Sequence, residues 1–124
     1  MDIYGEKLLD HYSNPRNYGL LDDADSTNEL ENVSCGDSVK ISVKVENGII
    51  NDIKFTGEGC AVAIGTASML LEYAKGKSVK EMLEFDLDKL LDLIGIELTM
   101  SRMKCANLSL ESLHNTLKDQ TVDR

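Results

Sequence analysis

The stretch VKISVKVENGIINDIKFTGEGC, residues 39–60, decides the fold. Its apolar side chains alternate with polar ones on both sides of Asn47-Gly48, at Val39, Ile41, Val43, Val45, Ile53 and Phe55. Alternation with a period of two residues predicts strands with one buried face. Asn-Gly between two such runs favours a type I′ turn, since that turn needs a positive φ at both central residues. We therefore expect an antiparallel hairpin in this stretch.

The segments on either side of the hairpin predict helices, because their apolar residues recur every three or four positions. We expect helices at residues 3–12, after Cys60 to Lys75, from Ser78, from Asp86 or Asp88 to Gly95, and at residues 106–118. Residues 22–32 are polar without periodicity and are expected to be extended, with an edge strand. This order indicates an α+β fold, a small antiparallel three-stranded sheet packed against helices. At this length we expect a single domain, residues 1–124.

Composition and charge exclude several classes of function. The 124 residues carry a net charge of −9, whereas a nucleic-acid-binding protein needs a basic surface to replace the counterions of phosphates. No apolar run approaches the roughly 18 residues of a membrane span. Residues 1–12 lack the basic-then-apolar order of a signal peptide. We expect a cytoplasmic protein with no nucleic-acid or membrane partner.

Cys35, Cys60 and Cys105 are an odd number of thiols in a chain that shows no secretory signal, which disfavours a disulfide framework. They lie too far apart for the paired C-x-x-C spacing of zinc fingers or thioredoxin-type redox sites. Each falls at a predicted boundary between elements, where Gly36 and Gly59 allow the backbone to approach closely. The sequence therefore favours free thiols used for metal or sulfur chemistry, if the fold brings them together.

The neighbours of these cysteines indicate reactive thiols. Cys60 and Cys105 are expected in the first turns of helices, where unpaired N–H groups and the helix dipole favour a thiolate. Lys104 adds a positive charge beside Cys105. Asp37 places a carboxylate two residues from Cys35. Oxygen holds iron less tightly than thiolate does, which suits a site that releases what it binds.

Together these residues resemble the IscU/NifU/SufU family of iron–sulfur cluster scaffolds. The matching stretches run in order through nearly the whole chain: Asp10-His11-Tyr12, Asn14-Pro15-Arg16-Asn17, Cys35-Gly36-Asp37, Gly59-Cys60, Lys75-Gly76-Lys77-Ser78 and Lys104-Cys105. The resemblance implies an α/β sandwich of the IscU/SufE type. It also implies a scaffold, rather than an enzyme with turnover, that accepts sulfur from a cysteine desulfurase and binds iron. Such a scaffold assembles a [2Fe–2S] cluster and transfers it to recipient apo-proteins.

The resemblance assigns roles to particular residues. Cys35, Cys60 and Cys105 match the ligands of the cluster, or of zinc at the same site, and Asp37 matches a metal-binding aspartate tied to cluster lability. Cys105 also matches the cysteine often assigned as the sulfur acceptor. Tyr4 aligns with a tyrosine implicated in the pairing of scaffold protomers, so a homo-oligomer is one expected state.

The sequence departs from the IscU pattern in two places. Lys104 stands where a histidine usually precedes the third cysteine, and a protonated lysine cannot bind metal. This favours Asp37 or a partner group as the fourth ligand, and gives Lys104 a candidate role in tuning the thiols. In residues 98–102, LTMSR replaces the LPPVK segment that IscU-type scaffolds present to a dedicated Hsp70. We therefore do not expect that chaperone as a partner.

Two other functions stay open. The first is a SufU-like sulfurtransferase, in which Asp37 and the cysteines hold zinc while one thiol relays persulfide sulfur from the desulfurase. Lys104 favours this alternative, whereas the absence of the segment that SufU-type chains carry between the second and third cysteines disfavours it. The second is a zinc-stabilised interaction domain, although a structural zinc site needs tighter closure by four ligands. His11 and His114 are expected to be structural.

Overall fold

The alternating stretch forms the predicted hairpin in the computed structural model, which describes residues 5–33 and 36–118. Strands β2 (Asp37–Glu46) and β3 (Ile49–Glu58) pair antiparallel. Asn47 and Gly48 have φ values of 53° and 77° at the turn, so both central residues adopt the positive φ that a type I′ turn needs. The apolar side chains of the pattern are buried, Phe55 completely, except that of Val45, which is partly buried.

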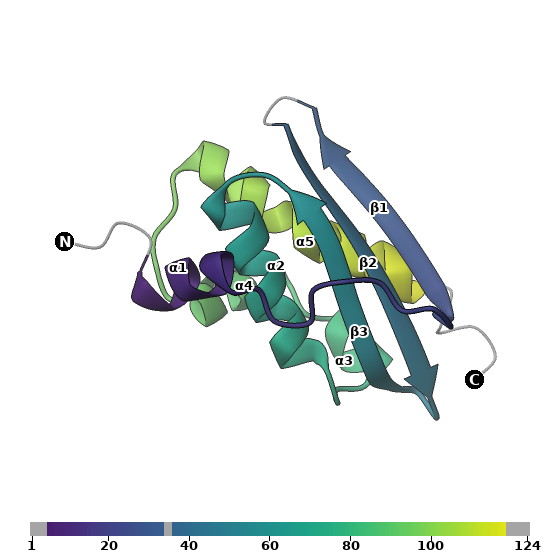
Figure 1. Cartoon of the computed structure of the whole chain (residues 1–124). Coiled ribbons are helices and arrows are strands. Elements are labelled where there is room, and N and C mark those ends of the chain that lie inside the picture. Colours follow the sequence, from purple (N-terminus) through teal and green to yellow (C-terminus); the bar gives the residue numbers. More distant parts are fainter. Residues whose placement is uncertain (1–4, 34–35, 119–124) are drawn as a thin grey trace.

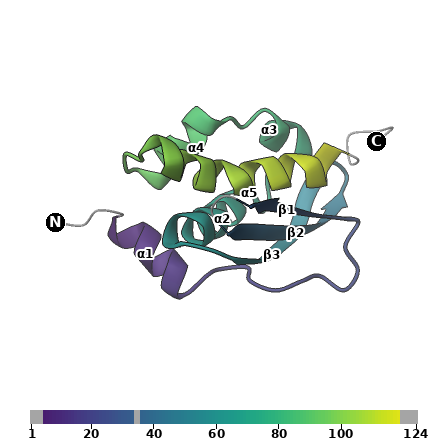
Figure 2. The ribbon, with the colours of Figure 1, turned by 90° about the horizontal axis from the view of Figure 1, so that it is seen from above.

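The predicted α+β fold is confirmed. Strand β1 (Ser26–Asn32) is the expected edge strand, and it pairs antiparallel with β2 to give a three-stranded sheet in the order β1-β2-β3. The helices are α1 (Glu6–Ser13), α2 (Ala61–Ala74), α3 (Val79–Leu83), α4 (Leu87–Ile94) and α5 (Met100–Lys118). Helices α2 and α5 cover one face of the sheet, and Figure 2 shows α3 and α4 on the far side of α5 from the sheet.

Residues 14–25 cross the face of the sheet that the helices leave open (Figures 1 and 2). The Phe55 N–H donates to the Asn17 carbonyl at 3.0 Å, so the segment first extends the outer edge of β3. It then reaches Ser42, whose hydroxyl accepts from the Leu21 N–H at 3.2 Å. Ser42 alternates with the core residues of β2 and therefore points away from the helices. The segment covers an edge and a face of the sheet that would otherwise be solvated.

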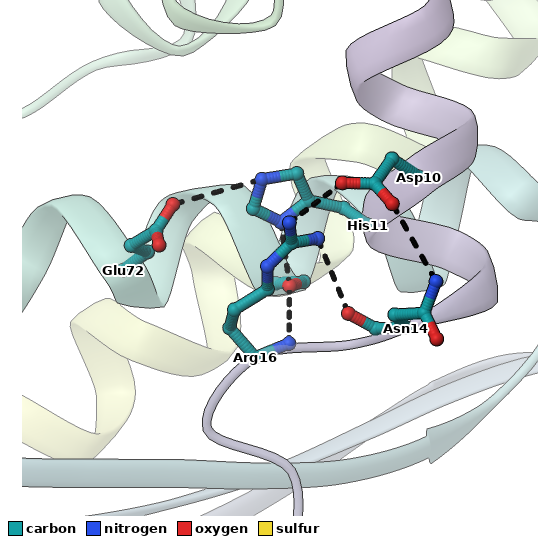
Figure 3. Close-up of polar contacts among 6 residues, drawn as sticks. Asp10, His11, Asn14, Arg16 and Glu72 are labelled. Atoms are coloured by element: carbon teal, nitrogen blue, oxygen red, sulfur yellow. Dashed lines mark hydrogen bonds and ion pairs between the residues drawn. The ribbon is translucent and has the colours of Figure 1, made fainter.

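A polar network fixes α1 on α2 (Figure 3). The Ser68 hydroxyl of α2 accepts from the Arg16 N–H at 2.8 Å, so its own proton is available for the His11 Nδ1 at 2.7 Å. His11 then carries its proton on Nε2, which faces Glu72 at 3.6 Å. Burial lowers the pKa of His11, consistent with a neutral imidazole. The structural role expected for His11 is confirmed.

Most predicted helix ends are confirmed, but the predicted starts of α1 and α5 are wrong. Helix α1 begins at Glu6, with Gly5 as its N-cap, rather than at residue 3. Ser78 and Asp86 cap α3 and α4 through their side chains, and Gly95 ends α4 in the left-handed conformation. Helix α5 begins at Met100, six residues before the predicted start at residue 106. Thr99 starts it, because its hydroxyl accepts from the Arg102 N–H. The segment has no proline, so nothing prevents the helix from forming there.

Candidate metal and sulfur site

Three distant segments bring a carboxylate and two thiols together at one end of the sheet. Asp37 is the first residue of β2, Cys60 is the N-cap of α2 directly after β3, and Cys105 lies in the second turn of α5. One ligand atom from each of these residues lies within 4.8 Å of the others. Cys35 lies outside the described residues, two positions before Asp37 in the chain.

The carboxylate of Asp37 is buried and only half satisfied. Asp37 is 3% exposed, its Oδ1 accepts from the Cys60 N–H at 3.2 Å, and its Oδ2 has no hydrogen-bond partner among residues 5–33 and 36–118. A buried carboxylate oxygen without a partner carries a desolvation cost that a bound cation or a donor would remove. A mixed set of sulfur and oxygen donors suits zinc and iron. The described side chains therefore fit a metal ion.

The environment of Cys105 differs from the one that we expected. Because α5 begins at Met100, this thiol does not lie in a first turn, and the expected stabilisation of its thiolate by the helix N-terminus is wrong. Its Sγ donates to the Ser101 carbonyl of the preceding turn at 3.7 Å. Burial, the Asp37 carboxylate and Cys60 raise its pKa above the usual range. Without a cation, the site keeps Cys105 as a thiol.

Cys60 matches the expected position more closely. It caps α2 in an extended conformation, φ −77° and ψ 173°, and its own side chain makes no capping hydrogen bond. Its thiol is partly exposed, whereas that of Cys105 is buried. Of the two described thiols, Cys60 is therefore the more open to solvent.

Lys104 lies on the exposed side of α5. It lines a cavity of about 290 Å³ together with Glu31, Asn32 and Val33 at the end of β1. The groups that shift the pKa of Cys105 are Asp37 and Cys60, in addition to burial. The tuning role of Lys104 stays a prediction.

Sequence reasoning missed one contributor to the site. The sequence predicted close approach of the backbone at Gly59 but not what approaches it: the space beside its Cα is taken by the Asp37 carboxylate. Of the other candidates, His114 is structural as expected, with its Nε2 3.1 Å from the Met82 carbonyl. No helix within residues 5–33 and 36–118 has both the length and the apolar character needed to cross a bilayer.

Comparison with known proteins gives one family and several relatives that are similar over most of this chain. Residues 3–122 match the NifU-like N terminal domain. The chain is 41% identical over 117 residues to the iron-sulfur cluster assembly scaffold protein IscU 1 of Archaeoglobus fulgidus, which covers 94% of this chain and 76% of that protein. It is 33% identical over 128 residues to the zinc-dependent sulfurtransferase SufU of Bacillus subtilis, covering 90% and 86% of the two chains.

A solved structure agrees with this fold. The crystal structure of a putative iron–sulfur cluster assembly scaffold protein for the SUF system from Fervidobacterium islandicum superposes with a TM-score of 0.81 at 27% identity. The superposition covers 94% of this chain and 97% of that one. The three-stranded sheet and its helices are thus an arrangement that this solved scaffold shares.

Proposed function

The chain belongs to the family of NifU-like N-terminal domains, and from this premise we propose that it is a scaffold on which an iron–sulfur cluster is assembled. In this proposal sulfur comes from a cysteine desulfurase, iron binds at Asp37 and the cysteines, and a [2Fe–2S] cluster passes to recipient apo-proteins. The chain acts by binding and transfer in the cytoplasm, rather than as an enzyme with turnover. Its similarity to proteins named as IscU scaffolds over most of its length supports this function.

The observation that carries the proposal is the meeting of Asp37, Cys60 and Cys105 within 4.8 Å. The three residues offer two soft sulfur donors and one hard oxygen donor, and the Asp37 Oδ2 has no hydrogen-bond partner among the described residues. In the proposal Cys35, outside the described residues, is the further cysteine ligand. The carboxylate oxygen binds more weakly than sulfur, so it is the contact that breaks first when the cargo leaves.

The sulfur step proposed for Cys105 is a thiol exchange. The Cys105 sulfur attacks the outer sulfur of a desulfurase persulfide, a new S–S bond forms on this chain, and the desulfurase thiolate leaves. The thiol proton must leave first, because the thiolate is the nucleophile. The raised pKa of Cys105 means that this proton is held until a cation or a docked partner changes the site.

A SufU-like zinc-dependent sulfurtransferase is the second candidate. The similarity to the protein named zinc-dependent sulfurtransferase SufU favours it, since the match covers 90% of this chain. In that reading Asp37 and the cysteines hold zinc, and one thiol relays persulfide sulfur without building a cluster.

Anaerobic reconstitution separates the two functions. The protein is mixed with ferrous iron, cysteine and a desulfurase, and visible absorption is recorded for the wild type, Asp37→Ala and the control Asp88→Ala. Asp88 is an exposed carboxylate on α4, so its removal should leave the spectrum unchanged. A scaffold gives an iron–sulfur spectrum that lasts longer in Asp37→Ala. A colourless zinc protein that still accelerates the desulfurase refutes the scaffold in favour of sulfur transfer.

A further inference from the structure

The backbone of Gly59 lies directly against the Asp37 side chain. A Cβ atom placed on Gly59 would overlap the Asp37 Oδ1, and it would lie 2.9 Å from Cγ and 3.2 Å from Cβ of the same residue. Real Cβ atoms do not approach other heavy atoms closer than about 3 Å. Any residue other than glycine at this position must therefore displace the carboxylate or move the backbone.

The backbone conformation of Gly59 is a second, separate reason for glycine. Its φ is +152°, in a region that residues with a Cβ rarely adopt. This conformation turns the chain from the end of β3 into Cys60, the N-cap of α2. The turn directs the Cys60 N–H at the Asp37 Oδ1, which accepts it at 3.2 Å.

These contacts give the two carboxylate oxygens of Asp37 different surroundings. Oδ1 is held by the Cys60 N–H, while Oδ2 is buried and has no partner in the part of the chain that the structure describes. The side chain is 3% exposed, so water does not compete for it. An amide that holds one oxygen of a ligating carboxylate fixes its orientation, and contacts of this kind tune metal affinity.

We propose that Gly59 is a positioning residue for Asp37. Its missing side chain lets the carboxylate sit against the turn, where the Cys60 N–H holds one oxygen and the other is left for a metal. The proposal rests on the proposed function only in taking Asp37 as a metal ligand. It holds equally for iron during cluster assembly and for zinc during sulfur transfer.

Zinc affinity of the purified apo-protein, measured by competition with a chromophoric chelator, tests the proposal. We compare Gly59→Ala, Asp37→Ala and the double variant with the wild type. Loss of a residue that orients a metal ligand costs about 10- to 100-fold in affinity, so Gly59→Ala should weaken zinc binding in that range. In the double variant Gly59→Ala should cause little further loss of zinc affinity beyond that of Asp37→Ala, because the Oδ1 and Cγ atoms that the new Cβ would overlap are gone.

Gly76→Ala is the matched control. Gly76 also has a positive φ, +90°, but a Cβ there would meet nothing within 4 Å. Gly76→Ala should introduce backbone strain at a positive φ but leave the zinc affinity unchanged. The proposal is overturned if Gly59→Ala binds zinc as tightly as the wild type. It is also overturned if Gly59→Ala lowers the zinc affinity by the same factor in the Asp37→Ala background as in the wild type.

Hydrogen exchange in the metal-free protein gives a readout that does not depend on the proposed function. The Cys60 amide should exchange faster in Gly59→Ala, and to the same extent as in Asp37→Ala, because both remove its acceptor. Unchanged protection in Gly59→Ala overturns the positioning role even if the wild type binds zinc. If the wild type binds no zinc, the proposed metal site is refuted. The exchange rate of the Cys60 amide still tests whether Gly59 positions the Asp37 side chain.

Failure of Gly59→Ala to fold also has a defined meaning. If the clash with Asp37 is the cause, the double variant regains the circular dichroism spectrum of the wild type. If Gly59→Ala and the double variant are both unfolded, the positive φ at residue 59 is by itself the reason for glycine, and the proposal is overturned.

Discussion

Replacing Ser68 by alanine removes a hydroxyl that bonds both His11 and Arg16 in the network that fixes α1 on α2; Figure 3 labels these two residues. The hydroxyl is fully buried and bonds two partners far away in the sequence, the His11 Nδ1 at 2.7 Å and the Arg16 N–H at 2.8 Å. His11 is 2% exposed, so water cannot easily replace the lost bond. The substitution Ser68→Ala thus leaves two polar groups without their partner.

The expected loss of stability follows from these two groups. A buried polar group left without a partner costs about 1 to 3 kcal/mol. The higher helix propensity of alanine returns about 0.5 kcal/mol. For two such groups we therefore expect Ser68→Ala to lower the free energy of unfolding by about 1.5 to 5.5 kcal/mol, a large part of the roughly 5 to 15 kcal/mol of a typical domain.

Urea titration followed by circular dichroism measures this loss, and Ser109→Ala is its control. Ser109 is equally buried, but its hydroxyl donates only to the Ala106 carbonyl of its own helix at 3.0 Å. Removing this hydroxyl leaves no distant polar group without its partner. It should lower the free energy of unfolding by less than about 1 kcal/mol. A Ser68→Ala loss no larger than that of Ser109→Ala would refute the reasoning.

Three further predictions concern pH, packing and Lys104. Burial lowers the pKa of His11 below its ordinary value near 6.5, so the unfolded chain binds this proton more readily than the folded one. Urea titrations should show the free energy of unfolding falling as the pH drops below about 6.5 toward the lowered pKa. The same dependence of that free energy on pH in a His11→Gln variant would contradict this. Gly65→Ala should lower the melting temperature despite a gain of about 1 kcal/mol in helix propensity, because the new Cβ would lie 2.8 Å from the Leu8 carbonyl oxygen of α1; a raised melting temperature would show that α1 yields. Lys104→Gln should change the rate of Cys105 alkylation only slightly, since exposed charges are screened by water, and a marked fall would support its tuning role.

The local part of the fold could be predicted because its causes are local. Alternation of apolar residues fixed which face of β2 and β3 is buried, and Asn47-Gly48 set the turn between them. The N-caps Ser78 and Asp86 act on amides three residues away. The predicted start of α5 was wrong, because the apolar spacing becomes regular only after Cys105, whereas the helix begins with the mixed polar and apolar residues 100–104.

The strand pattern, most helix ends and the residue types of the site could be predicted, since each depends on neighbours within a few positions. The packing of the elements sets the difference between Cys60, partly exposed at a helix end, and Cys105, buried in the second turn of α5. It also decided that Gly59 makes room for the Asp37 carboxylate. The physical reason is that burial and close approach depend on how α5 and the two strand ends pack together, and no spacing along the chain encodes those distances.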